Sequence, residues 1–207
     1  MRGITVFAAP RRPDRFRKAD IRLDDEARFL KSWLVNPLKT GAVSPSGKDL
    51  ARAMAEPLDL DIPGDIVELG PGTGPVTEAL LNRGVAPERL IVIEFNPDFC
   101  TLLRKRFPGI RVIEGDAYAM GRTLAGHICG PLAAVVSSLP LITRPDVERV
   151  RLLRDALGMM HPDAPFVQFT YGPASPVPLK GLPVRAEPSK RIWMNLPPAR
   201  VWTYRSA

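Results

Sequence analysis

Residues 67–75 read Val-Glu-Leu-Gly-Pro-Gly-Thr-Gly-Pro, and this stretch decides the fold of the chain. It follows an apolar run and precedes an amphipathic one, which predicts a turn between a buried strand and a helix. The glycines permit a tight turn and leave no Cβ between the backbone and a ligand. Free N–H groups at the start of the helix attract carboxylate or hydroxyl groups. The charge of Glu68 would repel a phosphate and attract a cationic amino group.

Two further apolar runs end in acidic residues. Leu90-Ile91-Val92-Ile93 leads into Glu94, twenty-four residues after Gly70, and an acid there can bind both hydroxyls of a ribose. Ile110-Arg111-Val112-Ile113-Glu114 leads into Gly115-Asp116-Ala117, whose aspartate can accept a hydrogen bond from an adenine amino group. An amino-acid end, a ribose and an adenine together predict S-adenosylmethionine as the cofactor, rather than NAD or ATP, with S-adenosylhomocysteine as the product.

Apolar and amphipathic segments alternate through the rest of the chain. After a short helix at about 47–55, strands are expected over 64–69, 89–94, 110–115, 133–138 and 164–171, and helices over 74–83, 96–106 and 146–160. This alternation predicts a mostly parallel sheet with helices on both faces. The proline-rich residues 172–190 are expected to be irregular, and 191–194 and 200–204 to form an antiparallel edge hairpin. The fold class is therefore α/β, with the Rossmann-like sheet of class I methyltransferases.

Hydroxyl groups follow the fourth and fifth expected strands. The fourth ends in Ser137-Ser138-Leu139-Pro140-Leu141 and the fifth in Tyr171. Ligands bind beyond the carboxyl ends of such strands, so Ser137, Ser138 and Tyr171 are the candidate catalytic residues. A plain strand end with a proline turn, and a tyrosine that packs on the sheet, are the structural alternatives. The expected cofactor-binding residues are Glu68, Gly70, Gly72, Thr73, Gly74, Glu94, Phe95, Asp116, Ala117 and Ser137.

Positive charge gathers towards both ends of the sequence. The net charge is +7, with +5 in residues 1–18, +5 in residues 180–207 and −3 in the residues between them. Such ends are either solvated and disordered or attracted to a polyanion, either a membrane surface or a nucleic acid.

The expected organisation is a disordered basic tail over 1–13, an amphipathic helix over 14–36 and a methyltransferase domain over 37–207. The helix has apolar residues at spacings of three and four, which suit either packing on the domain or binding at a membrane interface.

The remaining sequence features favour a cytoplasmic protein. Cys100 and Cys129 form no C-x-x-C pair, so buried free thiols are expected, and no metal site is predicted. No apolar run approaches the roughly 18 residues of a membrane span, and residues 4–9 are too short for a signal-peptide core. The sequence does not indicate an oligomeric state.

The glycine-rich turn, Glu94-Phe95-Asn96, Gly115-Asp116-Ala117 and Ser137-Ser138-Leu139-Pro140-Leu141 together resemble the bacterial phospholipid N-methyltransferases. The resemblance covers about residues 14–207. It implies stepwise methylation of phosphatidylethanolamine towards phosphatidylcholine with S-adenosylmethionine. It also implies an anionic membrane surface as partner, with the protein peripheral on the inner face of the bacterial membrane.

The main alternative is a ribosomal RNA adenine N6-dimethyltransferase, a group that shares the glycine-rich turn. In that group, the motif after the fourth strand resembles Asn-Leu-Pro-Tyr. At the matching positions, this chain has Ser138-Leu139-Pro140-Leu141. Loss of the aromatic would remove stacking worth about 1–3 kcal/mol per base. The group's helical C-terminal domain has no expected counterpart after residue 171, so no nucleic-acid partner is expected. A second alternative is a non-catalytic cofactor-binding protein that docks on membranes.

Overall fold

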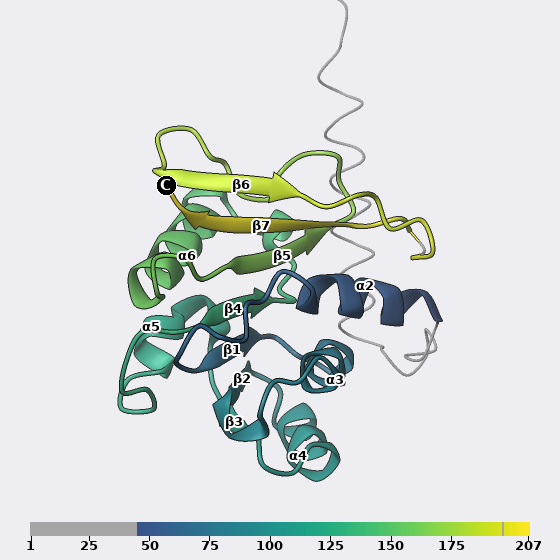
Figure 1. The fold of residues 1–207 in the computed structure, drawn as a ribbon, viewed down its shortest axis with the longest axis vertical. Helices are drawn as coiled ribbons and strands as arrows, with labels where there is room; N and C mark the ends of the chain where they lie inside the picture. The colour runs from purple at the N-terminus through teal and green to yellow at the C-terminus, as the bar shows by residue number, and fades with distance from the viewer. Residues whose placement is uncertain (1–44, 196) are drawn as a thin grey trace, which may run out of the picture.

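The computed structural model describes residues 45–195 and 197–207, which form a seven-stranded sheet with helices on both sides (Figure 1). The expected tail at 1–13 and the expected helix at 14–36 lie outside the described residues. The strand order is β3-β2-β1-β4-β5-β7-β6. The strands are β1 Ile66–Leu69, β2 Leu90–Glu94, β3 Arg111–Glu114, β4 Ala134–Ser137, β5 Phe166–Thr170, β6 Val184–Pro188 and β7 Arg200–Ser206.

The first five strands are parallel, and β7 runs antiparallel to both β5 and β6. Every residue of β1, β2, β4 and β5 is buried. These strands are mostly apolar because helices cover both of their faces, and the exceptions inside them are the buried side chains of Glu68 and Gln168. The predicted mostly parallel sheet with an antiparallel edge hairpin is therefore confirmed.

The helices divide between the two faces of the sheet. Figure 1 shows α2, α3 and α4 on one side and α5 and α6 on the other. Their bounds are α2 Pro45–Ala55, α3 Pro75–Asn82, α4 Pro97–Arg106, α5 Met120–Thr123 and α6 Asp146–Met159. The start of α4 is capped by Asn96, whose side chain accepts hydrogen bonds from the backbone N–H groups of Asp98 and Phe99. The short α5 helix was not predicted.

The edge hairpin differs from the prediction in one strand. Residues 184–188 form β6, although the proline-rich stretch around them was expected to be irregular, and 191–194 form no strand apart from a single bridge between Ile192 and Ala199. The sequence Val-Arg-Ala-Glu-Pro alternates between half-buried and exposed side chains until its last residue. An edge strand of this kind needs only one neighbour and one apolar face, so a search for continuous apolar runs misses it.

None of the helices formed by the described residues is long and apolar enough to cross a bilayer. Both cysteines are free, but Cys129 is exposed, whereas the prediction placed both thiols in the interior. The described part of the chain contains no cluster of His, Cys, Asp and Glu suited to a metal ion.

Candidate active site

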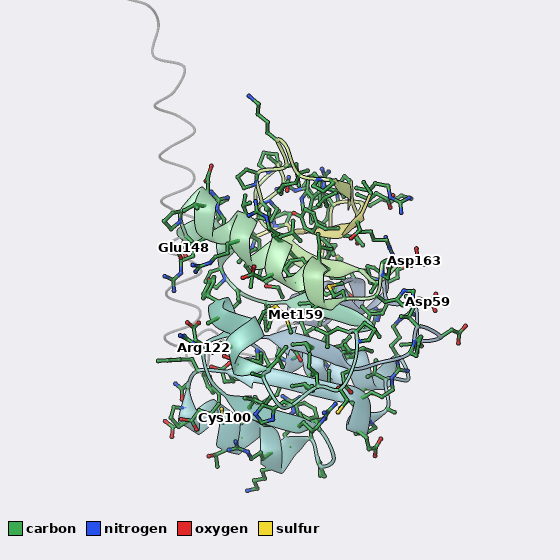
Figure 2. All side chains as sticks on the ribbon, turned by 90° about the vertical axis from the view of Figure 1, so that its left-hand side faces the viewer. Asp59, Cys100, Arg122, Glu148, Met159 and Asp163 are labelled. Carbon is green, nitrogen blue, oxygen red and sulfur yellow. The ribbon has the colours of Figure 1, made fainter. Side chains whose placement is uncertain are left out.

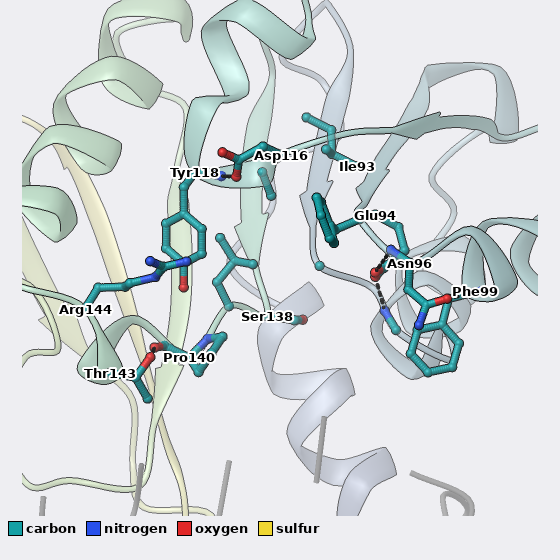
Figure 3. A pocket seen from close by; sticks show the side chains of 15 residues that line it. Ile93, Glu94, Asn96, Phe99, Asp116, Tyr118, Ser138, Pro140, Thr143 and Arg144 are labelled. Atoms are coloured by element: carbon teal, nitrogen blue, oxygen red, sulfur yellow. Dashed lines mark hydrogen bonds between the residues drawn. The ribbon is translucent and has the colours of Figure 1, made fainter. Parts of the chain in front are cut away.

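A cavity of about 730 Å³ opens beyond the carboxyl ends of β1 to β4 (Figure 3). Its position is the one that parallel α/β sheets use for ligands. Loops after four strands contribute to its wall, so residues far apart in sequence meet there. The lining residues are Gly70, Gly72, Ile93, Glu94, Phe95, Asn96, Phe99, Asp116, Ala117, Tyr118, Ser138, Leu139, Pro140, Thr143 and Arg144.

The three glycines of the turn after β1 have different roles, although all have positive φ. A Cβ on Gly70 would lie 2.8 Å from Leu139 Cδ2, so this glycine lets two loops approach each other. A Cβ on Gly72 would meet nothing within 4 Å, so its open side is available to a ligand. A Cβ on Gly74 would lie 2.5 Å from Phe107 Cε2. Gly74 is therefore required for packing, and neither it nor its predecessor Thr73 lines the cavity.

Glu94 fastens the glycine-rich turn to the start of α4. Its Oε2 accepts a hydrogen bond from the Gly72 N–H at 3.0 Å, and its Oε1 accepts one from the Asn96 N–H at 2.9 Å. The side chain is almost buried yet lines the cavity. Each carboxylate oxygen has lone pairs beyond the one that it uses here. The carboxylate can therefore hold the turn and also accept hydrogen bonds from the two hydroxyls of a ribose.

The residues predicted to bind the adenine also lie at the cavity, where they present a carboxylate and an aromatic ring. Asp116 is exposed, lines the cavity and accepts a hydrogen bond from the Tyr118 N–H at 2.9 Å. Phe95 is 79% exposed at the cavity wall, and Ala117 is buried beside Asp116. An exposed aromatic face and a carboxylate suit a planar base with an amino group. The structure thus brings the predicted residues Glu94, Phe95, Asp116 and Ala117 into one cavity.

Glu68 lies beneath the turn and does not line the cavity. Its side chain has no exposed surface, and its Oε2 accepts a hydrogen bond from the Thr77 hydroxyl at 2.6 Å. Its Oε1 has no hydrogen-bond partner. Burial raises the pKa of Glu68 to about 8, and the charge of Glu94 adds to the rise while Thr77 opposes it. The carboxyl group is therefore mostly protonated at neutral pH, and a direct contact with the cofactor stays a prediction.

The three predicted catalytic residues are separated. Ser138 lines the cavity, and its buried hydroxyl has no hydrogen-bond partner. Ser137 is fully buried outside the cavity lining, and its hydroxyl accepts a hydrogen bond from the Leu139 N–H at 3.4 Å. Tyr171 lines a separate cavity of about 10 Å³, with its ring edge-on to Phe169 at a centroid distance of 5.5 Å.

Sequence reasoning missed the wall formed by Tyr118, Thr143 and Arg144. The short 3₁₀ turn Leu141–Thr143 brings Arg144 to the cavity, where its guanidinium carbon lies 4.3 Å from the centroid of the Tyr118 ring. Burial raises the pKa of Tyr118, and the nearby Arg144 opposes that rise. Tyr118 follows the expected strand 110–115, and Arg144 follows the expected strand 133–138. Their positions after strand ends were the signal in the sequence that could have indicated them.

Comparison with known proteins gives both sequence relatives and structural neighbours. No family model matches the chain. The ornithine lipid N-methyltransferase of Singulisphaera acidiphila is 31% identical over 148 residues, which cover 70% of this chain and 77% of that protein. The ribosomal RNA small subunit methyltransferase A of Synechococcus sp. (strain JA-3-3Ab) is 36% identical over 92 residues, which cover 43% of this chain and 29% of that protein.

Two solved structures share the fold at low sequence identity. TrmN from Thermus thermophilus has a TM-score of 0.59 and 18% identity, with 77% of this chain and 49% of that one covered. A TehB-like S-adenosylmethionine-dependent methyltransferase from Corynebacterium glutamicum has a TM-score of 0.54 and 13% identity, with 91% and 100% covered.

The sheet order, the cavity at the strand ends and these relatives define a class I methyltransferase that uses S-adenosylmethionine. Within that class, the chain belongs to the family of the ornithine lipid N-methyltransferase of Singulisphaera acidiphila.

Proposed function

We propose that this enzyme transfers methyl groups from S-adenosylmethionine to the amine of phosphatidylethanolamine, stepwise towards phosphatidylcholine, at a membrane surface. The observation that carries the proposal is the turn after β4. Leu141, which follows Pro140, is 1% exposed and has no aromatic ring to stack on a flipped base. The match to a lipid methyltransferase also covers 77% of that protein, whereas the match to the ribosomal RNA enzyme of Synechococcus covers 29%.

In this proposal, the cofactor is bound by residues that follow β1, β2 and β3. Glu94 accepts hydrogen bonds from the ribose of the cofactor, Asp116 binds the adenine amino group, and Phe95 packs on the base. The open side of Gly72 admits the amino-acid end. When bound, the cofactor supplies a methyl group on a positively charged sulfur, which a neutral amine can attack.

The amine must lose its proton before it can accept a methyl group. A primary amine with a pKa near 10.4 is about 3.4 units from neutral pH, so its neutral form costs roughly 4.6 kcal/mol. A dry cavity lowers that cost because burial disfavours the ammonium ion. Ser138, with its unpaired buried hydroxyl in the cavity wall, orients the amine by hydrogen bonding. Fixed alignment of the reacting groups supplies further acceleration.

An ornithine lipid is the second candidate substrate, because the relative at 31% identity is named for it. It also presents an amine together with an anionic group, which here is a carboxylate instead of a phosphodiester.

Attachment to the membrane is part of the proposal. The loop between β6 and β7 exposes Trp193 and Met194, which are 74% and 72% accessible. Because Thr170 pairs with Arg200, this loop projects from the end of the sheet at which β5 finishes. Exposed aromatic and thioether side chains at that end suit contact with a bilayer. They would act together with the expected helix at 14–36, which lies outside the described residues.

The test is to incubate the full chain with methyl-labelled S-adenosylmethionine and three separate acceptors: phosphatidylethanolamine vesicles, ornithine lipid vesicles and ribosomal RNA. We expect label in phosphatidylethanolamine, with mono-, di- and trimethylated products resolved by mass spectrometry. Label in the ornithine lipid alone would select the second candidate, and label in RNA alone would refute a lipid function. Cofactor binding without any methylated acceptor would favour the non-catalytic alternative.

A further inference from the structure

One wall of the cavity has a positive charge held against an aromatic ring. The Arg144 guanidinium carbon lies 4.3 Å from the centroid of the Tyr118 ring. In Figure 3 the two side chains lie across the cavity from Glu94 and Asn96. Among the described residues that line the cavity, Arg144 is the one with a positive charge, and Glu94 and Asp116 carry the negative charges. Glu94 lies across the cavity from Arg144, whereas Asp116 lies beside Tyr118, whose backbone N–H donates to it, and the charge of Asp116 acts on Arg144.

The intramolecular contacts of Arg144 leave donors free. Its Nη1 lies 3.7 Å from the Oε2 of Glu148 on helix α6 (Figure 2), and the two side chains are 46% and 34% exposed. Pairs of this kind contribute about 0–1 kcal/mol. The guanidinium also interacts with the Tyr118 hydroxyl. A guanidinium has five N–H donors, so these two contacts do not use its capacity. A ligand with two acceptor oxygens can displace Glu148 at small cost.

Tyr118 and Ser138 add two further polar groups near this wall. The Ser138 hydroxyl is buried and has no hydrogen-bond partner among the described residues, whereas the buried Tyr118 hydroxyl interacts with the Arg144 guanidinium. Buried hydroxyls normally have a partner, and both residues line the cavity. The unpaired state of Ser138 points to a ligand that supplies an acceptor or a donor in the cavity.

We propose that Arg144, held in place by the Tyr118 ring, binds the anionic group of the substrate next to the amine that is methylated. The chemistry recognised is a phosphodiester or a carboxylate, because arginine binds both in a bidentate manner. The inference rests on the proposed lipid function and adds a preference to it: a lipid with an anionic group beside the amine binds more tightly than a lipid without one. In the proposed arrangement, the amino-acid end of the cofactor has a separate place at the open side of Gly72.

The test compares Arg144→Met with Arg154→Met, a control at an exposed arginine of α6. Substrates are presented in neutral detergent micelles, so that surface charge is the same for all proteins. Three amine lipids are used: phosphatidylethanolamine, an ornithine lipid, and a diacylglycerol whose ethylamine is joined by an uncharged linker. The first two are zwitterions with an anionic group beside the amine. For each of these anion-containing lipids that the wild type methylates, we expect Arg144→Met to raise KM about ten- to hundredfold, in the range for hydrogen bonds to charged groups.

The uncharged lipid separates anion binding from a general defect. Its KM should be equal in the wild type and in Arg144→Met, as should the Kd for S-adenosylmethionine measured by calorimetry. Arg144→Lys should recover part of the affinity for the anion-containing lipids. Glu148→Gln should lower their KM by up to a few-fold, because it removes the competing carboxylate.

Three results would overturn the inference: an unchanged KM for the anion-containing lipids in Arg144→Met, an equal rise for the uncharged lipid, or a weaker affinity for the cofactor. The last result would assign Arg144 to the cofactor instead. If the wild type methylates no lipid at all, the proposed function fails. If it methylates the lipids and Arg144→Met behaves like the wild type, the present inference alone fails.

Discussion

Replacing Glu68 with glutamine tests whether this carboxyl group is protonated beneath the glycine-rich turn. Glu68 is ionised above a pKa of about 4.5 in the unfolded chain, but burial raises its pKa to about 8 in the folded protein. Between these values the folded state binds one more proton than the unfolded state. The free energy of unfolding of the wild type should therefore fall as pH rises through this window. Glutamine does not titrate, and it can still accept the hydrogen bond from Thr77.

The magnitude follows from the two pKa values. Between pH of about 5 and about 7.5, the wild type should lose about 3 kcal/mol of stability relative to the Glu68→Gln variant. Thr77 limits the effect, because its hydroxyl favours the ionised carboxylate through the 2.6 Å hydrogen bond.

Urea unfolding followed by circular dichroism at a series of pH values measures the difference. The matched control is Glu78→Gln, on helix α3, since Glu78 is 49% exposed and pairs with Arg106 at the surface. Its pH profile should follow that of the wild type. The reasoning is refuted if the stability profiles of Glu68→Gln and the wild type stay parallel within about 1 kcal/mol between these pH values. That result would mean that the pKa of Glu68 is nearly the same in the folded and the unfolded protein.

Three further predictions concern ligands. Glu94→Ala should weaken binding of S-adenosylmethionine by about 1.5–3 kcal/mol, the range for hydrogen bonds to a charged group, and wild-type affinity in calorimetry would remove Glu94 from the ribose site. Ser138→Ala should lower kcat for lipid methylation without changing cofactor affinity, and an unchanged kcat would exclude its role in orienting the amine. Trp193→Ser combined with Met194→Ser should reduce co-flotation with vesicles, since burial of each side chain is worth up to about 1.5–3 kcal/mol. Val147→Ser, at an equally exposed apolar residue of α6, should not, and equal flotation of all three proteins would contradict a membrane role for the loop.

The central strands and the meeting of Glu94 and Asp116 in one cavity could be predicted, because local patterns determine them. A fully buried parallel strand is mostly apolar, so the ends of β1 and β2 are visible in the sequence. The half-buried β3 still has Val112 and Ile113 before its exposed Glu114. The acids near the ends of β2 and β3, Glu94 and Asp116, then meet in one cavity because parallel strands finish at the same edge.

The wall formed by Tyr118 and Arg144 could not be predicted in the same way. Arg144 reaches the cavity through a short 3₁₀ turn, and its neighbour Tyr118 comes from another loop, so their contact depends on tertiary packing. Gly74 has the spacing of a cofactor glycine, but its lack of a Cβ makes room for Phe107, which is distant in sequence. Tyr171 follows directly after β5, which ends at Thr170, and lines a small second cavity.

The two hydrogen bonds of Glu94 have a consequence for repeated turnover. Because its carboxylate already joins Gly72 to Asn96, the glycine-rich turn is ordered before any cofactor arrives. The conformational entropy lost in ordering the turn is therefore a cost of folding and not of each binding event. The proposed stepwise methylation would require spent cofactor to be exchanged for fresh cofactor between steps. A turn that keeps its shape throughout that exchange is ready for the next cofactor as soon as the last one leaves.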